Sequence, residues 1–235
     1  MVDRFGDYIE KRKSIRKYDP SELDEQTLDS VRAQISSVVP LFPDVRYGIE
    51  IVGKVKGLSN VKAPHYLIFY GEANDKSYQN VGFIGQQMDL FFSSAGIGSC
   101  WLGMAKPAEG ESGPLPCIIG MAFGKPGESL YRDASEFKRK PAEAVCEGDD
   151  KRLNAARLAP SARNEQSWFF KADRGKILCY LAQSAGLIGL LAKKLKHIDI
   201  GIAICHLAQK SDGFKFIYES HVPYKKGYIY VGTVI

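Results

Sequence analysis

The sequence lacks several patterns that would place it in a specialised class of protein. Its N-terminus, MVDRFGDYIEKRKSIRKY, is charged throughout and has no hydrophobic signal core, and no apolar run approaches the ~20 residues that a membrane helix needs. Neither GxxxxGKS/T nor GxGxxG occurs, so the common phosphate-loop and dinucleotide-binding fingerprints are both missing. These absences predict a cytoplasmic protein that does not associate with a membrane.

Metal and nucleic-acid signals are missing as well. The five cysteines are odd in number and widely spaced, which predicts reduced thiols, and neither they nor the four histidines have metal-ligand spacing. His206 lies on an otherwise apolar helix face, where a hydrogen-bonded core histidine is more common than a metal ligand. The 32 Lys and Arg and 27 Asp and Glu are scattered, so the net charge of +5 forms no block that would bind a nucleic acid. The excess positive charge suits a small anionic ligand.

What the chain does have is enough apolar sequence for a large core. It contains 235 residues, of which 45% are hydrophobic, which suffices for one large domain or two small ones. Apolar periodicity predicts helices at residues 24–37, 82–95 and 151–158 and through His206, and strands at 46–52, 65–70, 100–104, 117–123, 168–171, 214–218 and 228–234. Residues 124–149 are rich in Gly, Pro and charge and indicate a linker.

The pattern of the second half repeats that of the first. Pairs of similar residues recur at a nearly constant interval: Asn80 with Asp199 and Gly82 with Gly201, 119 residues apart, and Pro40 with Pro160, 120 residues apart. Two short matches can arise by chance, but their common interval and the shared order of helices and strands favour an internal duplication. We therefore expect one half at residues 1–130 and a second at 131–235.

A first candidate site lies in RKSIRKY. Arg12, Lys13, Ser14 and Arg16 offer two guanidinium groups, an ammonium group and a hydroxyl within five residues. Arginine makes bidentate, charge-assisted hydrogen bonds to phosphate oxygens and serine adds a neutral donor, so this set suits a phosphate. By itself, such a basic run is more often a solvated surface.

Two further segments combine small residues with polar or aromatic ones. In ARLAPSARNEQSWFF, the small residues would let the backbone approach a flat ligand, and the amides of Asn164 and Gln166 can donate and accept along the edge of a heteroaromatic ring. In SSAGIGSCWLGM, Gly103 would let the backbone contact a ligand without a Cβ in between. Each segment could instead be an ordinary turn that leads into a buried strand.

The ordered set RKSIRKYDP, GSCWLG, KRKP and APSARNEQSW closely resembles the FMN-dependent nitroreductase family over most of the chain. The resemblance implies an α+β, nitroreductase-like fold with mainly antiparallel sheets flanked by helices. It also implies these contacts with FMN: Arg12, Lys13, Ser14 and Arg16 at the phosphate and pyrimidine edge, Leu102 and Gly103 beside the reactive nitrogen, and Lys138 and Arg139 in support of the phosphate.

The chain departs from the family in an informative way. Ordinary members carry a Pro-Ser-small-x-Asn turn shortly after the first helix and lend it to the neighbouring subunit's flavin. Here that position reads VVPLFPDVRY, and the polar turn occurs only in the second half, as Pro160, Ser161, Ala162 and Asn164. The second half in turn lacks a full RxSxR cluster. The simplest interpretation is a monomeric, single-chain pseudo-dimer with one complete flavin site.

The resemblance implies an FMN-dependent oxidoreductase that takes hydride from NADH or NADPH and reduces a small-molecule electron acceptor, such as a nitroaromatic or quinone, in a ping-pong cycle. Because the cofactor supplies the redox chemistry, no catalytic side chain is expected, and Arg16 would place positive charge near the pyrimidine edge. Two alternatives are an FMN store or sensor without efficient turnover and a scaffold that has lost its flavin. The intact RKSIR and PSARN clusters argue against the scaffold.

Overall fold

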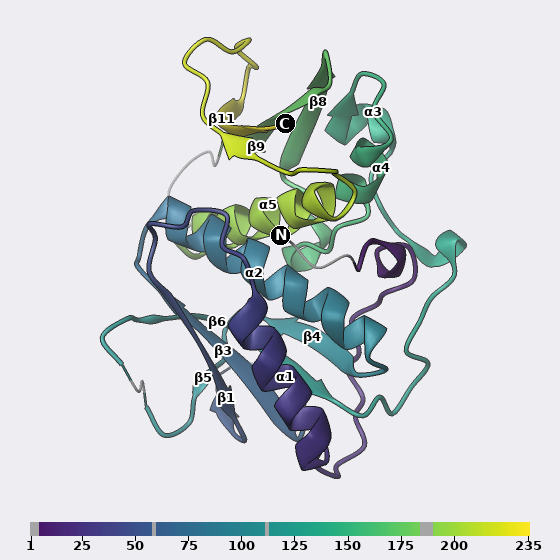
Figure 1. Ribbon diagram of the computed structural model, residues 1–235, viewed down its shortest axis with the longest axis vertical. Helices are drawn as coiled ribbons and strands as arrows, with labels where there is room; N and C mark the ends of the chain where they lie inside the picture. The colour runs from purple at the N-terminus through teal and green to yellow at the C-terminus, as the bar shows by residue number, and fades with distance from the viewer. Residues whose placement is uncertain (1–4, 58–59, 111–112, 184–189) are drawn as a thin grey trace.

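Two long helices form the centre of the molecule, between two sheets (Figure 1). A computed structural model describes residues 5–57, 60–110, 113–183 and 190–235. The central helices are α2 (Asp75–Ser94) and α5 (Leu190–Gln209). One core cluster contains residues from both sheets and from α1, α2, α4 and α5, so the halves share a continuous apolar interior.

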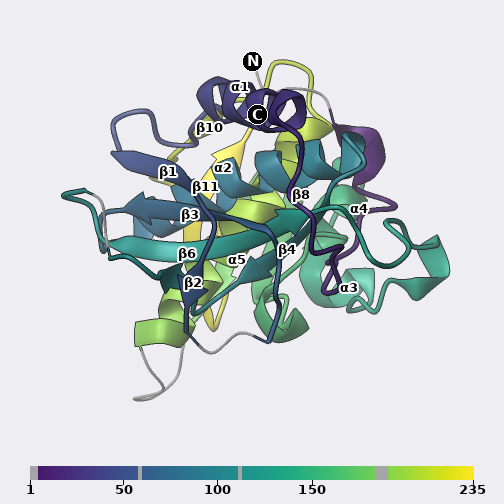
Figure 2. The same ribbon diagram turned by 90° about the horizontal axis from the view of Figure 1, so that it is seen from below.

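The first sheet is antiparallel, in the order β1-β3-β6-β4. Its strands are β1 (Tyr47–Val52), β3 (His65–Gly71), β6 (Cys117–Gly124) and β4 (Gly98–Leu102). Figure 2 shows β1, β3 and β6 side by side from below. The helix α1 (Glu25–Ser37) begins at Asp24, whose carboxylate accepts the backbone N–H of Thr27 at 2.7 Å and so caps the helix. Two short strands, β2 (Val55–Lys56) and β5 (Lys106–Pro107), pair separately.

The second sheet has the order β7-β8-β9-β11-β10, and among the described strands only β7 and β8 pair in parallel. Its strands are β7 (Cys146–Glu147), β8 (Trp168–Asp173), β9 (Lys176–Ala182), β11 (Tyr228–Val234) and β10 (Phe216–Ile217). Two short helices, α3 (Ala142–Val145) and α4 (Arg152–Arg157), precede β8.

The two sheets have the same internal order. In each, a helix (α1 or α4) precedes two paired strands (β1 and β3, or β8 and β9), and a long helix (α2 or α5) follows them. The next strand (β4 or β10) lies at the edge of the sheet, and the last strand (β6 or β11) pairs between that edge strand and the first two. The order β1-β3-β6-β4 thus corresponds to β8-β9-β11-β10, with β7 as an addition to the second sheet.

The central helices approach closely at two glycines. A Cβ on Gly82 would lie 2.0 Å from the carbonyl oxygen of Ile198, and a Cβ on Gly201 would lie 2.1 Å from that of Gln79. Each glycine therefore faces the residue three positions before the other glycine, which is the reciprocal arrangement of a two-fold contact. Any side chain at either glycine would force the helices apart.

The sequence predicted most of these elements, and the main differences concern α2, β9, the strand at 214–218 and the linker. The helix α2 begins seven residues before the predicted position, because its first turn is polar and begins at an Asn74 side chain that accepts the N–H of Ser77 at 2.9 Å. The strand β9 was not predicted, because its apolar run was assigned to the following helix. The predicted strand at 214–218 is reduced to Phe216–Ile217, and the linker contains α3 and β7.

Candidate functional site

Two adjoining cavities form a cleft between the N-terminal segment and the turn after α4. One, of about 360 Å³, is mainly polar, and the other, of about 310 Å³, is mainly apolar. They share five lining residues: Ser14, Arg16, Pro160, Ser161 and Arg163. The first candidate cluster and the PSARN turn, far apart in sequence, therefore meet at one site.

The polar cavity gathers positive charge without a matching number of acids. Arg12, Arg16, Arg132, Lys138, Arg139 and Arg163 line it, together with a single described acid, Glu136. Burial and, to a lesser extent, the nearby charge of Arg12 lower the pKa of Arg132 and of Arg139 to about 10 each. Among the described residues, Arg12 Nη1 and Arg132 Nε are buried and have no hydrogen-bond partner. Unpaired buried donors and crowded cations fit a doubly charged phosphate.

A buried polar network holds Arg12 in place. The Nε of Arg12 lies 2.8 Å from Oδ2 of Asp89, close enough for an ion pair although not aligned for a hydrogen bond, and both side chains are 1% exposed. Asp89 also accepts from Ser99 Oγ at 2.6 Å and from Gln86 Nε2 at 2.9 Å. Arg12 Nη2 donates to Ser14 Oγ at 3.3 Å. The network thus orients Arg12 and Ser14, which line the cleft.

The same network extends to His206. Its Nδ1 lies 2.8 Å from the carbonyl oxygen of Ala155, which can only accept, so Nδ1 carries the proton. Its Nε2 therefore accepts from Gln86 Nε2 at 3.1 Å. Burial lowers the pKa of His206 to about 3, so the ring is neutral. His206 is a hydrogen-bonded core residue, as its apolar surroundings predicted.

The PSARN turn is held in an unusual backbone conformation. Arg163, Asn164 and Gln166 have φ angles of 53°, 58° and 47°, in a region that side chains other than glycine rarely adopt. Asn164 Oδ1 accepts from Arg139 Nη1 at 3.0 Å, and its Nδ2 donates to the carbonyl oxygen of Lys138 at 2.6 Å. Asn164 therefore joins this turn to the KRKP segment. Such strain is common where a backbone is shaped for a ligand.

The apolar cavity is lined by one wall of aromatic and small residues and another from α5. The first wall contains Trp101, Gly103 and Met104, and the second contains Leu195, Ile198 and Ile202. The position of Trp101 is fixed by its neighbours: its Nε1 donates to Gln86 Oε1 at 3.3 Å, and a Cβ at Gly85 would lie 2.3 Å from its ring. The shape suits a flat ring system between two apolar surfaces.

One carboxyl group lies in this apolar cavity. Asp199, on α5, is 4% exposed, and its Oδ1 and Oδ2 accept the backbone N–H of Ala162 at 3.0 and 3.1 Å. Burial raises its pKa to about 8.

Most of the predicted site residues meet in the cleft. The residues that line it are Arg12, Ser14, Arg16, Gly103, Lys138, Arg139, Pro160, Ser161, Ala162 and Asn164. Three predicted residues do not line the cleft. Lys13 lines a neighbouring cavity, where its Nζ lies 3.7 Å from Oε2 of Glu128. Leu102 is buried in β4, and Gln166 is 2% exposed.

The prediction that Gln166 lies along a ring edge needs correction. Its Oε1 accepts the backbone N–H of Lys140 at 2.8 Å and its Nε2 donates to the carbonyl oxygen of Asn164 at 3.0 Å, so its amide shapes the turn. The residues that sequence reasoning missed include Arg132, Arg163 and Asp199. Arg163 stands inside the recognised PSARN motif, whereas nothing local marks the other two.

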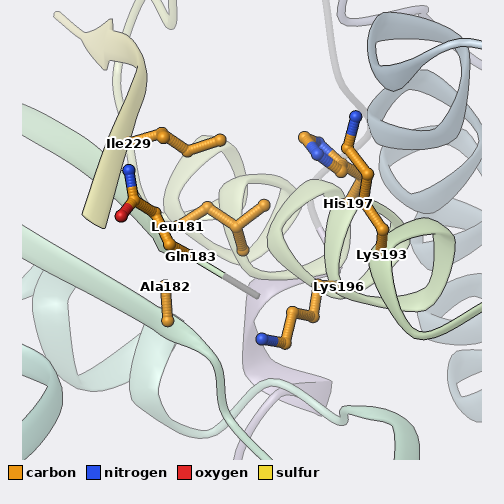
Figure 3. A pocket seen from close by; sticks show the side chains of 7 residues that line it. All are labelled: Leu181, Ala182, Gln183, Lys193, Lys196, His197 and Ile229. Carbon is orange, nitrogen blue, oxygen red and sulfur yellow. The ribbon is translucent and has the colours of Figure 1, made fainter. Parts of the chain in front are cut away.

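A separate cavity of about 310 Å³ lies between the ends of β9 and β11 and the start of α5 (Figure 3). None of the predicted site residues lines it. Two of its three basic side chains already have an acidic partner, because Lys193 Nζ lies 2.9 Å and His197 Nε2 lies 3.4 Å from Oδ2 of Asp75. It is therefore a weaker candidate for an anionic ligand than the cleft.

Comparison with known proteins agrees with the fold. The sequence model of the family described as "Putative TM nitroreductase" matches residues 6–211. The chain belongs to this family. Its membership makes the protein an oxidoreductase of the nitroreductase type.

Several solved structures of proteins described as nitroreductases are similar to this chain. A putative nitroreductase from Thermotoga maritima MSB8 is 20% identical, with a TM-score of 0.66 over 100% of this chain and 93% of that one. An FMN-dependent nitroreductase from Clostridium difficile R20291 is 16% identical, with a TM-score of 0.44 over 57% and 96% of the two chains. No curated protein matches the sequence. At these identities the first likeness shows a shared α+β fold.

The described part of this nitroreductase offers few other sites. Within residues 5–57, 60–110, 113–183 and 190–235, no group of three or more His, Cys, Asp or Glu side chains could hold a metal ion. No helix in those ranges has both the length and the apolar character needed to cross a membrane. The cleft therefore remains the principal candidate.

Proposed function

We propose that this chain binds one FMN in the cleft and acts as an FMN-dependent NAD(P)H oxidoreductase. The observation that carries the proposal is the pairing of opposite chemistries in adjoining cavities. Two buried guanidinium nitrogens without a hydrogen-bond partner, Arg12 Nη1 and Arg132 Nε, lie at one end, and an apolar slot beside Trp101 lies at the other. A flavin mononucleotide has this division, with a phosphate at one end and a flat ring system at the other. Bound FMN would supply the hydride chemistry.

The residues of the cleft have distinct tasks in this proposal. Arg12, Arg132 and Arg139 bind the phosphate, and Asn164 orients Arg139 toward it. Arg16 lines both cavities, so it can place positive charge beside the ring system and stabilise the negative charge that an arriving hydride would bring to the ring. Trp101 and the α5 side chains exclude water from the ring.

We also propose that the chain is a pseudo-dimer of two related halves, residues 1–130 and 131–235. Their equal strand order and the reciprocal glycine contacts support this. A third feature repeats as well: Phe42 N–H donates to Asn80 Oδ1 at 3.2 Å, and Ala162 N–H donates to Asp199 Oδ1 at 3.0 Å. Both partners of this hydrogen bond recur at intervals of 119 and 120 residues.

The second, symmetry-related position is filled by protein. Phe42 corresponds to Ala162 of the cleft, 120 residues later, and Phe83 corresponds to Ile202, 119 residues later. Phe42 packs against Phe216 with ring centroids 5.8 Å apart, and Phe83 stacks on Phe214 at 5.6 Å. In this proposal, these four aromatic rings fill the space that corresponds to the ring-binding part of the cleft. This supports one FMN per chain, bound without a partner subunit.

The donor would be NADH or NADPH, and the acceptor a small electron-poor molecule such as a quinone or nitroaromatic. The test is an FMN titration by fluorescence quenching, followed by anaerobic addition of NADH and then of a quinone. We expect tight binding, bleaching of the flavin absorbance by NADH, and its return with the quinone. An FMN store would bind FMN but bleach slowly or not at all.

A charge reversal provides the specific control. Arg16→Glu should abolish FMN binding, because a carboxylate would face the phosphate and the ring edge, whereas Arg46→Glu makes the same change at a side chain that is 72% exposed and outside the cleft. Equal FMN affinity in the two variants would show that the cleft is not the flavin site.

A further inference from the structure

We infer that Asp199 is a catalytic residue, a protonated carboxyl group in the apolar cavity that gives a proton to the bound flavin as hydride arrives. The inference rests on the proposed function and adds to it a proton donor from the protein. Four observations carry it: the position of Asp199, its hydrogen bonds, its difference from Asn80 and the balance of the reaction.

The position of Asp199 brings it to the ring-binding half of the cleft. It lines the apolar cavity between Ile198 and Ile202, the α5 residues of one wall, and it contacts the turn at Ala162. Although it is nearly inaccessible to solvent, it lies at the surface of the cavity that a flat ring would occupy. A group that hands a proton to a cofactor must be within hydrogen-bond reach of it, and this placement allows that reach.

The hydrogen bonds of Asp199 leave its own proton without an acceptor. Both carboxyl oxygens accept from the same donor, the backbone N–H of Ala162. Within the described part of the chain, the backbone N–H of Ala162 is the hydrogen-bond partner recorded for Asp199. A buried carboxyl O–H requires an acceptor, so a bound ligand is the group that can provide one.

The comparison with Asn80 shows that capping the turn does not require a carboxyl group. Asn80 Oδ1 accepts the N–H groups of Leu41 and Phe42 at 2.8 and 3.2 Å, and its Nδ2 lies 3.4 Å from the carbonyl oxygens of Phe42 and Val45. The amide therefore satisfies its own donors within the protein. Asn80 therefore lies beside the position that aromatic rings fill, whereas Asp199 lies beside the open cleft.

The surroundings keep the proton on Asp199 at neutral pH. Burial raises the pKa to about 8, the Ala162 N–H lowers it, and the nearby charge of Glu165 raises it. The other ionisable groups that line the same cavity are Arg16, Arg163 and Cys100. An acid that titrates near the working pH can both lose and regain a proton during each cycle.

The reaction requires such a proton. NAD(P)H delivers two electrons and one hydrogen nucleus as a hydride, whereas complete reduction of a flavin takes up two electrons and two protons. The second proton comes from Asp199: its O–H bond breaks, a new bond forms to a ring nitrogen of the flavin, and a carboxylate remains. The acceptor then takes two electrons and two protons from the reduced flavin, and the carboxylate regains its proton from solvent.

The direct test is infrared difference spectroscopy of the FMN-loaded protein as dithionite reduces the flavin. We expect the C=O band of a protonated carboxylic acid to be lost on reduction, and this change to be missing in Asp199→Asn. The asparagine keeps an oxygen for the Ala162 N–H, so the turn should survive. Glu165→Gln, an exposed change in the same turn, should keep the band. No carboxyl change in the wild-type protein would overturn the inference whether or not the variant folds.

Stopped-flow reduction by NADH gives a second readout. The wild-type rate should fall as pH rises through about 8, because the acid form is lost there, and Asp199→Asn should be about 100-fold slower at pH 7 and show no such fall. Equal rates and equal pH profiles would overturn the role of Asp199 and leave the flavin site intact. A wild-type protein that retains no FMN would instead overturn the proposed function, and this inference with it.

Discussion

The glycines at the crossing of α2 and α5 allow a stringent test of the core. Gly82→Ala would place a methyl group 2.0 Å from the carbonyl oxygen of Ile198, and Gly201→Ala would place one 2.1 Å from that of Gln79. Carbon atoms do not approach backbone oxygens so closely, and the backbone of a packed helix cannot turn aside as a flexible side chain can. Each substitution must therefore push the two central helices apart.

The expected cost follows from two opposing effects. Overpacking a well-filled core costs roughly 1–3 kcal/mol and occasionally more, and contact with backbone favours the upper end. Alanine recovers about 1 kcal/mol over glycine in a helix interior. We expect a net loss of about 2 kcal/mol for each variant, which corresponds to a fall in Tm of roughly 4–8 °C for a chain of this size.

Thermal unfolding followed by circular dichroism measures this directly. Gly53→Ala is the matched control, because a Cβ there has no neighbour within 4 Å, and its Tm should change little. The two core variants should have similar effects, because their contacts are equivalent. Together they should cost less than the sum of the two, because the first already separates the helices. A Tm equal to or above that of the wild type in either single variant would refute the close packing of α2 against α5.

Two further predictions concern buried ionisable groups. Burial raises the pKa of Asp199 in the folded chain from 3.8 to about 8, so the flavin-free protein should lose stability as pH rises from about 4 to about 8. Asp199→Asn should flatten that loss in urea titrations, and an equally steep fall in the variant would contradict the assignment. Because burial lowers the pKa of His206 to about 3, ¹⁵N NMR should show one neutral Nδ1–H tautomer from pH 5 to 8, and a titration within that range would contradict it.

The sequence predicted those parts of the site that lie within short motifs. Arg12, Ser14 and Arg16 stand within five residues, and Pro160 to Asn164 form one turn, so their residue types suited a phosphate and a flat ligand. The family resemblance then favoured this interpretation over a solvated surface or an ordinary turn. The four strands of the first sheet were predicted because their apolar runs are bounded by clear turn residues, whereas the two-residue strands β2 and β5 were not.

Other parts depend on contacts between distant segments. Arg132 reaches the polar cavity because its N–H donates to the carbonyl oxygen of Lys11 at 2.9 Å, a pairing that no local pattern indicates. The use of Gln166 inside the turn depends on the backbone of Lys140, 26 residues earlier. Asp199 was recognised as the counterpart of Asn80, but its place in the cavity depends on how α5 packs. Short motifs were thus predictable and long-range pairings were not.

The central claim is one FMN in each chain, held in a cleft that a single polypeptide completes. Native mass spectrometry of the protein after incubation with FMN and desalting tests it most directly. We expect one chain with one FMN as the main species, because in the proposed pseudo-dimer Phe42, Phe83, Phe214 and Phe216 fill the second position. An obligate dimer with two flavins, or a chain that retains none, would contradict it.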